Sequence, residues 1–205
     1  MEDTYLTIST ISEGLYKEKG SKFLAFAIPV TSVSEVKTIL EEKRKVYYDA
    51  RHVCYAYLIG EETKESRSND DGEPSGTAGK PILGAILSKQ LTNVLIVVVR
   101  YFGGTKLGTS GLINAYREAS FDALENNEII EKTIETPIEI NFDYISMNDV
   151  MKVIKELSPT ILNQEFDNLC CMNLSIRKSD YPRIIDKFKN IDGLTINNKK
   201  SEDSI

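Results

Sequence analysis

Residues 94–108 read VLIVVVRYFGGTKLG, and this stretch decides the fold. The unbroken apolar run from Val94 to Val99 predicts a strand that is buried on both faces of a sheet. Arg100 ends that run, and a guanidinium there needs an anionic ligand or a carboxylate as its partner. The backbone N–H groups of the turn could hold a phosphate, with Arg100 and Lys106 as counter-charges. The alternative is a tight turn whose aromatic residues belong to the core.

The residues around this turn narrow the choice of ligand. Tyr101 or Phe102 could stack on a base. The dinucleotide spacing GxGxxG is absent, so a Rossmann site is excluded. Thr109 or Ser110 is expected to cap the helix that follows.

A second polar stretch, residues 61–79, reads EETKESRSNDDGEPSGTAG and shows no apolar periodicity. It predicts a long loop, and such a loop within a compact domain is usually functional or disordered. Pro81 suits the first turn of a helix, whose N-terminal N–H groups could bind an anion beside Lys80. Pro81 also stands where a Walker A motif requires Ser or Thr, so that motif is excluded. The alternative is a solvated loop stiffened by turn residues.

The remaining elements are placed by periodicity and turn residues. Strands are expected at residues 4–18, 21–30 and 51–60. Ser32 and Glu35 have the spacing of a capping box, so a helix begins there. From residue 133 onward the order of expected elements is β-α-β-β-α-β, the split pattern of ferredoxin-like domains. The chain is therefore expected to contain two domains, at 1–132 and 133–205.

His52 and Cys54 are the candidates for nucleophilic chemistry. Side chains two positions apart on a strand point to the same side, and a Cys/His pair can generate a thiolate. The favoured interpretation is a core cysteine beside a hydrogen-bonded histidine. Asp70, Asp71 and Glu73 lack the spacing of an EF-hand, and no Cys/His spacing fits zinc, so no metal and no cofactor are expected.

Charge and composition limit the classes of function. The net charge is −6, and residues 1–132 and 133–205 each contribute −3, from 16 basic and 19 acidic residues and from 9 and 12. Neither half is a basic domain, which excludes a bulk electrostatic attraction to nucleic acid and leaves a local basic patch open. No apolar run is long enough to span a membrane, and the acidic start does not resemble a signal peptide. A cytoplasmic protein is expected.

Four segments of the chain form a recognisable set: Ser21-Lys22-Phe23, His52 to Ala56, Asp71 to Leu83, and Val97 to Gly108. Together they resemble the signature of the IMPACT family, and specifically its bacterial YigZ-type branch. The resemblance covers about residues 15–125, with the segments in the expected order, and residues 133–197 resemble the small C-terminal domain of that branch.

This resemblance implies an α+β fold. The N-terminal domain is expected to be similar to the second domain of a small-subunit ribosomal protein, a β-sheet with helices on one face and a left-handed β-α-β crossover. The C-terminal domain, with its ferredoxin-like βαββαβ order, is expected to be similar to the last domain of elongation factor G.

The resemblance also implies a role in the regulation of translation. The leading hypothesis is a non-enzymatic protein that binds RNA, the ribosome or a phosphate-bearing small molecule through residues 70–80 and 100–108. The alternatives are a hydrolase of phosphate esters or nucleotides that uses Asp71, Glu73 and His52, and a protein–protein adaptor. The expected ligand-binding residues are Arg51, His52, Asp71, Glu73, Ser75, Thr77, Lys80, Arg100, Tyr101, Gly103, Gly104 and Lys106.

Overall fold

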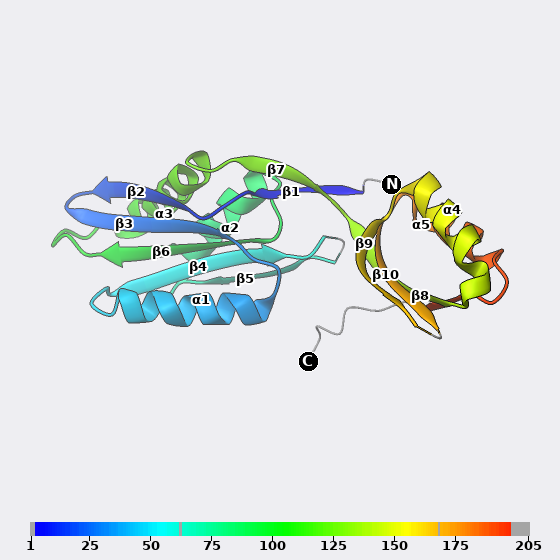
Figure 1. The fold of residues 1–205 in the computed structure, drawn as a ribbon. Coiled ribbons are helices and arrows are strands. Elements are labelled where there is room, and N and C mark those ends of the chain that lie inside the picture. Colours follow the sequence, from blue (N-terminus) through cyan, green and yellow to red (C-terminus); the bar gives the residue numbers. More distant parts are fainter. Residues whose placement is uncertain (1–2, 62, 168, 198–205) are drawn as a thin grey trace. The chain divides into compact units, whose positions relative to one another are not determined.

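The computed structural model describes residues 3–61, 63–167 and 169–197 (Figure 1). The chain divides into two compact units, of which one runs from Tyr5 to Lys132 and the other contains the residues from Thr133 onward. Asp3 and Thr4 belong to the second unit, and the Asp3 carboxylate accepts hydrogen bonds from the Arg177 guanidinium at 2.6 and 3.0 Å. The C-terminal unit therefore includes residues from the opposite end of the chain.

A five-stranded antiparallel sheet forms the centre of the N-terminal unit. Its strand order is β2-β3-β6-β4-β5. The side chains from Val94 to Val99 on the central strand are completely buried, as the apolar run predicts. The strands are β2 (Ser12–Glu18), β3 (Ser21–Pro29), β4 (His52–Ile59), β5 (Glu65–Asn69) and β6 (Val94–Tyr101).

Helices cover both faces of this sheet, so the expectation of helices on one face is wrong. The helices α2 (Gly79–Ser88) and α3 (Gly108–Glu125) pack on one face, and α1 (Val33–Val46) packs on the other (Figure 1). The reason lies in β6, whose successive side chains enter two separate cores. The β3-α1-β4 connection joins two strands that are both antiparallel to β6, and its left-handed sense stays a prediction.

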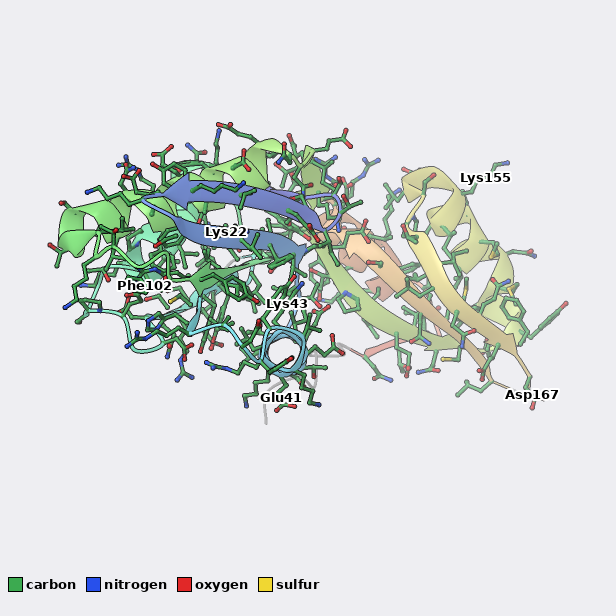
Figure 2. The ribbon with its side chains drawn as sticks, turned by 90° about the vertical axis from the view of Figure 1, so that its left-hand side faces the viewer. Lys22, Glu41, Lys43, Phe102, Lys155 and Asp167 are labelled. Atoms are coloured by element: carbon green, nitrogen blue, oxygen red, sulfur yellow. The ribbon has the colours of Figure 1, made fainter. Side chains whose placement is uncertain are left out.

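The charged stretch of α1, residues 41–45, is not exposed to solvent at every position. Lys43 Nζ lies 3.5 Å from the centre of the Phe26 ring, where the cation interacts with the aromatic face. Figure 2 shows Lys43 on the side of α1 that faces the sheet and Glu41 on the opposite side. At the start of α1 the expected cap is present, because the Ser32 hydroxyl accepts from the Glu35 N–H at 3.2 Å.

Two stretches differ from their predicted secondary structure. Within the predicted loop 61–79, β5 pairs with β4 as an edge strand that has no apolar pattern to reveal it. The predicted strand 4–18 is divided into two. Its first part, β1 (Thr4–Ile8), forms a separate two-stranded sheet with β7 (Ile129–Thr133).

The C-terminal unit has the predicted order β-α-β-β-α-β. Its strand order is β11-β8-β10-β9, all antiparallel, and both helices contribute to one core with β8 and β10. Its likeness to a domain of elongation factor G stays a prediction. The elements are β8 (Glu135–Phe142), the 3-10 turn η1 (Tyr144–Ser146), α4 (Met147–Leu157), β9 (Thr160–Phe166), β10 (Cys170–Arg177), α5 (Tyr181–Lys189) and β11 (Thr195–Asn197).

Among the described residues, none of the helices has the length and apolar character needed to cross a membrane.

Candidate functional site

A cleft of about 460 Å³ lies in the N-terminal unit, and both glycine-rich segments contribute to it. The loop after β5 supplies one wall, and the turn after β6 with the start of α3 supplies another. The residues just before and at the start of β4 complete the lining. The cleft is lined by Arg51, His52, Gly72, Glu73, Pro74, Arg100, Phe102, Lys106, Leu107, Gly108, Thr109 and Leu112.

The N-terminus of α3 faces this cleft without a side-chain cap. Leu107 occupies the cap position and makes no capping hydrogen bond, so the prediction of Thr109 or Ser110 as the cap is wrong. The first turn carries no acidic residue, while Gly108 and Thr109 line the cleft. Backbone N–H groups at a helix start have no partner within the helix and lie at its positive end. This wall of the cleft is therefore suited to negative charge.

The N-terminus of α2, where an anion was also expected, is already occupied by the chain itself. The Asp70 carboxylate accepts from the N–H groups of Gly76, Ala78 and Gly79 at 2.8, 3.0 and 2.8 Å. Burial works to raise the pKa of Asp70, but these three donors outweigh it and hold the pKa below its ordinary value. Lys80 is exposed and does not line the cleft. The start of α2 thus binds the chain's own Asp70 carboxylate in the place where an external anion was predicted.

Arg100 has a carboxylate partner, one of the two partners expected for it. Its Nη1 donates to Glu73 Oε1 at 2.5 Å, and the two side chains are only 7% and 3% exposed. Tyr116 donates its hydroxyl to the same Glu73 oxygen at 2.8 Å. Arg100 is therefore not a free counter-charge for a phosphate. Its Nε, however, is buried without a hydrogen-bond partner among the described residues.

Asp71 organises the loop instead of facing the cleft. Its carboxylate accepts from the Val53 N–H at 2.6 Å and forms an ion pair with Arg44 at 2.7 Å. Its carbonyl oxygen lies 2.8 Å from His52 Nδ1, and a carbonyl only accepts, so Nδ1 carries a proton. The other ring nitrogen, Nε2, lies 3.9 Å from Glu73 Oε1.

The contacts fit the favoured interpretation, a core cysteine beside a hydrogen-bonded histidine, and do not support the alternative of nucleophilic Cys/His chemistry. Burial raises the pKa of Cys54 to about 12, so a thiolate does not form at neutral pH. The thiol donates to the Asp70 carbonyl oxygen at 3.0 Å and also lies 3.4 Å from the Tyr116 hydroxyl. Within the described ranges, His, Cys, Asp and Glu side chains form no group of three that could hold a metal ion.

Five other predicted ligand-binding residues lie outside the lining of the cleft. Thr77 is buried, and its hydroxyl donates to the Pro74 carbonyl oxygen at 2.7 Å. The Gly103 N–H donates to Ser21 Oγ at 3.1 Å, so it is not available to a phosphate. Ser75 and Gly104 are exposed.

Tyr101, the fifth predicted residue outside the lining, does not face the cleft. Phe102, the other aromatic residue considered for stacking, lines it instead. The Tyr101 hydroxyl donates to Asp49 at 2.8 Å, and its ring packs with the core on the α1 side of the sheet. Phe102 lines the cleft, and its ring centre lies 5.7 Å from the Arg100 guanidinium carbon. The sequence signal is the alternation of side chains along β6, which separates Arg100 from Tyr101; Phe102 directly follows the strand, two positions after Arg100.

The cleft thus brings together five of the predicted ligand-binding residues, which are Arg51, His52, Glu73, Arg100 and Lys106. Its apolar lining, Pro74, Phe102, Leu107 and Leu112, was not predicted as part of the site. No sequence signal separates Leu107 and Leu112 from ordinary core residues on an amphipathic helix, because both fit that pattern equally well.

Comparison with known proteins identifies relatives over most of the chain. Residues 19–124 match the family described as the Impact N-terminal domain. The IMPACT family member YvyE from Bacillus subtilis is 33% identical over 156 residues, which are 76% of this chain and 72% of that protein. The IMPACT family member YigZ from Escherichia coli is 30% identical over 160 residues, which are 77% and 78% of the two chains.

A solved structure extends the likeness to the fold of nearly the whole chain. It is the crystal structure of a hypothetical protein, is 25% identical, and covers 98% of this chain and 100% of its own. The TM-score is 0.74.

Proposed function

Since the chain belongs to the IMPACT family, we propose that it is a non-enzymatic, cytoplasmic protein of translational regulation that binds RNA phosphates in the cleft. The binding groups are the first N–H groups of α3 and the side chains of Arg51 and Lys106. His52, next to Arg51 at the start of β4, lines the same cleft and completes the set of polar groups.

One observation carries this proposal: an uncapped helix N-terminus and unpaired cations line one cleft. Arg51 and Lys106 are exposed lining residues, and neither has an ion-pair partner in the described part of the chain. The nearby carboxylates do not cancel them, because Glu73 pairs with Arg100 and Asp71 with Arg44. The cleft is therefore locally positive in a chain of net charge −6.

One donor of the lining residues is unsatisfied in the part of the chain that the structure describes. Arg100 lines the cleft, and its Nε has no hydrogen-bond partner among the described residues. A buried N–H that lacks a partner costs about 1–3 kcal/mol. Because this atom is itself closed to solvent, a ligand oxygen reaches it only if neighbouring side chains move.

Two of the three candidate residues of the hydrolase hypothesis are already paired, and the third, His52, lines the cleft. Asp71 and Glu73 are held by Arg44 and Arg100, and Asp71 does not line the cleft. A metal-dependent hydrolysis would need carboxylates that are free to coordinate an ion. An adaptor function is distinguished by experiment, since binding to a protein partner would survive nuclease treatment and high salt.

Filter binding with ribosomal RNA at several salt concentrations tests the proposal. Arg51→Ala/Lys106→Ala is expected to weaken binding and to reduce the slope of log K against log salt by about 1.4, at about 0.7 per phosphate contact. The matched control is Lys37→Ala/Lys152→Ala, two exposed lysines outside the cleft. Equal loss in both double variants, or no RNA binding by the unmodified chain, would contradict the proposal.

A further inference from the structure

The lining of the cleft is more apolar than a site for a bare phosphate requires. Pro74, Phe102, Leu107 and Leu112 lie beside the cationic groups. A volume of about 460 Å³ is in the range of small-molecule sites, which combine apolar walls with a few converging polar groups. A backbone phosphate on its own would leave these apolar walls without a partner.

Phe102 is placed to receive an aromatic ring. It is 44% exposed, whereas Phe23, whose ring also lies against the Arg100 guanidinium, is completely buried. The Arg100 guanidinium carbon lies 5.7 Å from its ring centre and 5.4 Å from the Phe23 ring centre, so Arg100 supports Phe102 from within the domain. Figure 2 shows Phe102 on the side of the N-terminal unit that faces the viewer. A base can stack on an exposed ring held in this way.

We infer that the cleft takes a nucleotide, with its phosphate at the N-terminus of α3 and its base against Phe102. Lys106 and Arg51 neutralise the phosphate, and Leu107 and Leu112 contact the apolar part of the ligand. The inference rests on the proposed function, because it uses the same cleft and the same cationic groups. It adds that the recognised unit includes a base. That unit is either a free nucleotide or a nucleotide of single-stranded RNA, since both present the same groups.

Isothermal titration of the full chain with adenosine monophosphate (AMP) and ribose 5-phosphate tests this inference. AMP is expected to bind about tenfold more tightly, within the range measured for stacking of one base on an aromatic residue. Phe102→Ala is expected to remove that advantage and to leave ribose 5-phosphate binding unchanged. Phe102→Tyr should keep it, and so should the control Tyr48→Ala, which removes an 85% exposed aromatic residue outside the cleft.

The outcomes separate this inference from the proposed function. Equal binding of AMP and ribose 5-phosphate would overturn the nucleotide inference and leave a phosphate site in place. Absence of binding by both, together with no RNA binding, would overturn both proposals. A hexamer of adenylate, titrated in parallel, distinguishes the two sources. If the hexamer binds more tightly than AMP and Phe102→Ala removes this difference, the site is assigned to RNA. If the hexamer and AMP bind equally, the site is assigned to free nucleotides.

Discussion

Replacing Glu73 with glutamine tests the buried ion pair that forms the floor of the cleft. The two side chains are 3% and 7% exposed, and Glu73 Oε1 accepts from both Arg100 and Tyr116. Removing one partner of a buried pair leaves the other charge uncompensated and costs about 3–5 kcal/mol. The glutamine oxygen can still accept both hydrogen bonds, and only the charge is lost, so we expect a loss of about 3 kcal/mol in the free energy of unfolding.

Urea unfolding followed by circular dichroism measures this loss, and amide hydrogen exchange along β6 assigns it to the N-terminal unit. A loss of about 3 kcal/mol corresponds to a Tm lower by about 6–12 °C at this chain length. The matched control is Glu118→Gln, which breaks the exposed pair with Arg117 and should cost less than about 1 kcal/mol. Equal losses in the two variants would refute the argument that the Glu73–Arg100 pair is a desolvated, stabilising contact.

Three further predictions concern the loops around the cleft. The pKa of Asp70 lies below 3.8, so its stabilisation is complete above that pH and is lost as the pH falls through the lower folded-state value. Asp70→Asn should therefore lower the free energy of unfolding by about 2 kcal/mol at neutral pH and should reduce the loss of stability between about pH 7 and about pH 2, as measured by urea unfolding. An unchanged loss of stability over this acidic range would contradict the prediction. Burial raises the pKa of Cys54 to about 12, so this thiol should resist iodoacetamide at pH 8 in the folded chain and react in urea, as measured by peptide mass spectrometry. Rapid labelling of the folded chain would show that the site opens to solvent. Gly103→Ala places a Cβ 1.9 Å from the Gly20 carbonyl carbon and should lower the free energy of unfolding by at least about 2 kcal/mol. Gly84→Ala adds a Cβ in open space on α2 and should raise it by about 0.5–1 kcal/mol, so similar Tm values for the two variants would be inconsistent with the close approach at Gly103.

The architecture could be predicted where apolar patterning is strong. The run from Val94 to Val99 predicts the central strand, and periodicity predicts the β-α-β-β-α-β order of the C-terminal unit. The strand β5 could not be predicted in this way, because it is an exposed edge strand of polar residues held by backbone pairing with β4. The run predicted burial on both faces of the sheet but not what covers them, and the expectation of helices on one face came from the family resemblance.

The candidate site could be predicted as a pair of segments but not as a set of contacts. The sequence identifies two glycine-rich stretches at helix starts, and both contribute to the cleft. It does not show that Asp70 occupies one helix start or that Glu73 pairs with Arg100, since each contact depends on how the loop folds back. Lys80 and Asp71 were therefore expected at a ligand that they do not face.

An NMR titration of the full chain with inorganic phosphate and then AMP tests most directly where negative charge binds. The amide signals of Gly108 and Thr109 are predicted to shift, because their N–H groups lie at the uncapped start of α3 in the cleft. Those of Ala78 and Gly79 are predicted to stay in place, because Asp70 already accepts their hydrogen bonds. Shifts at Ala78 and Gly79, with none at Gly108 and Thr109, would contradict the proposed site.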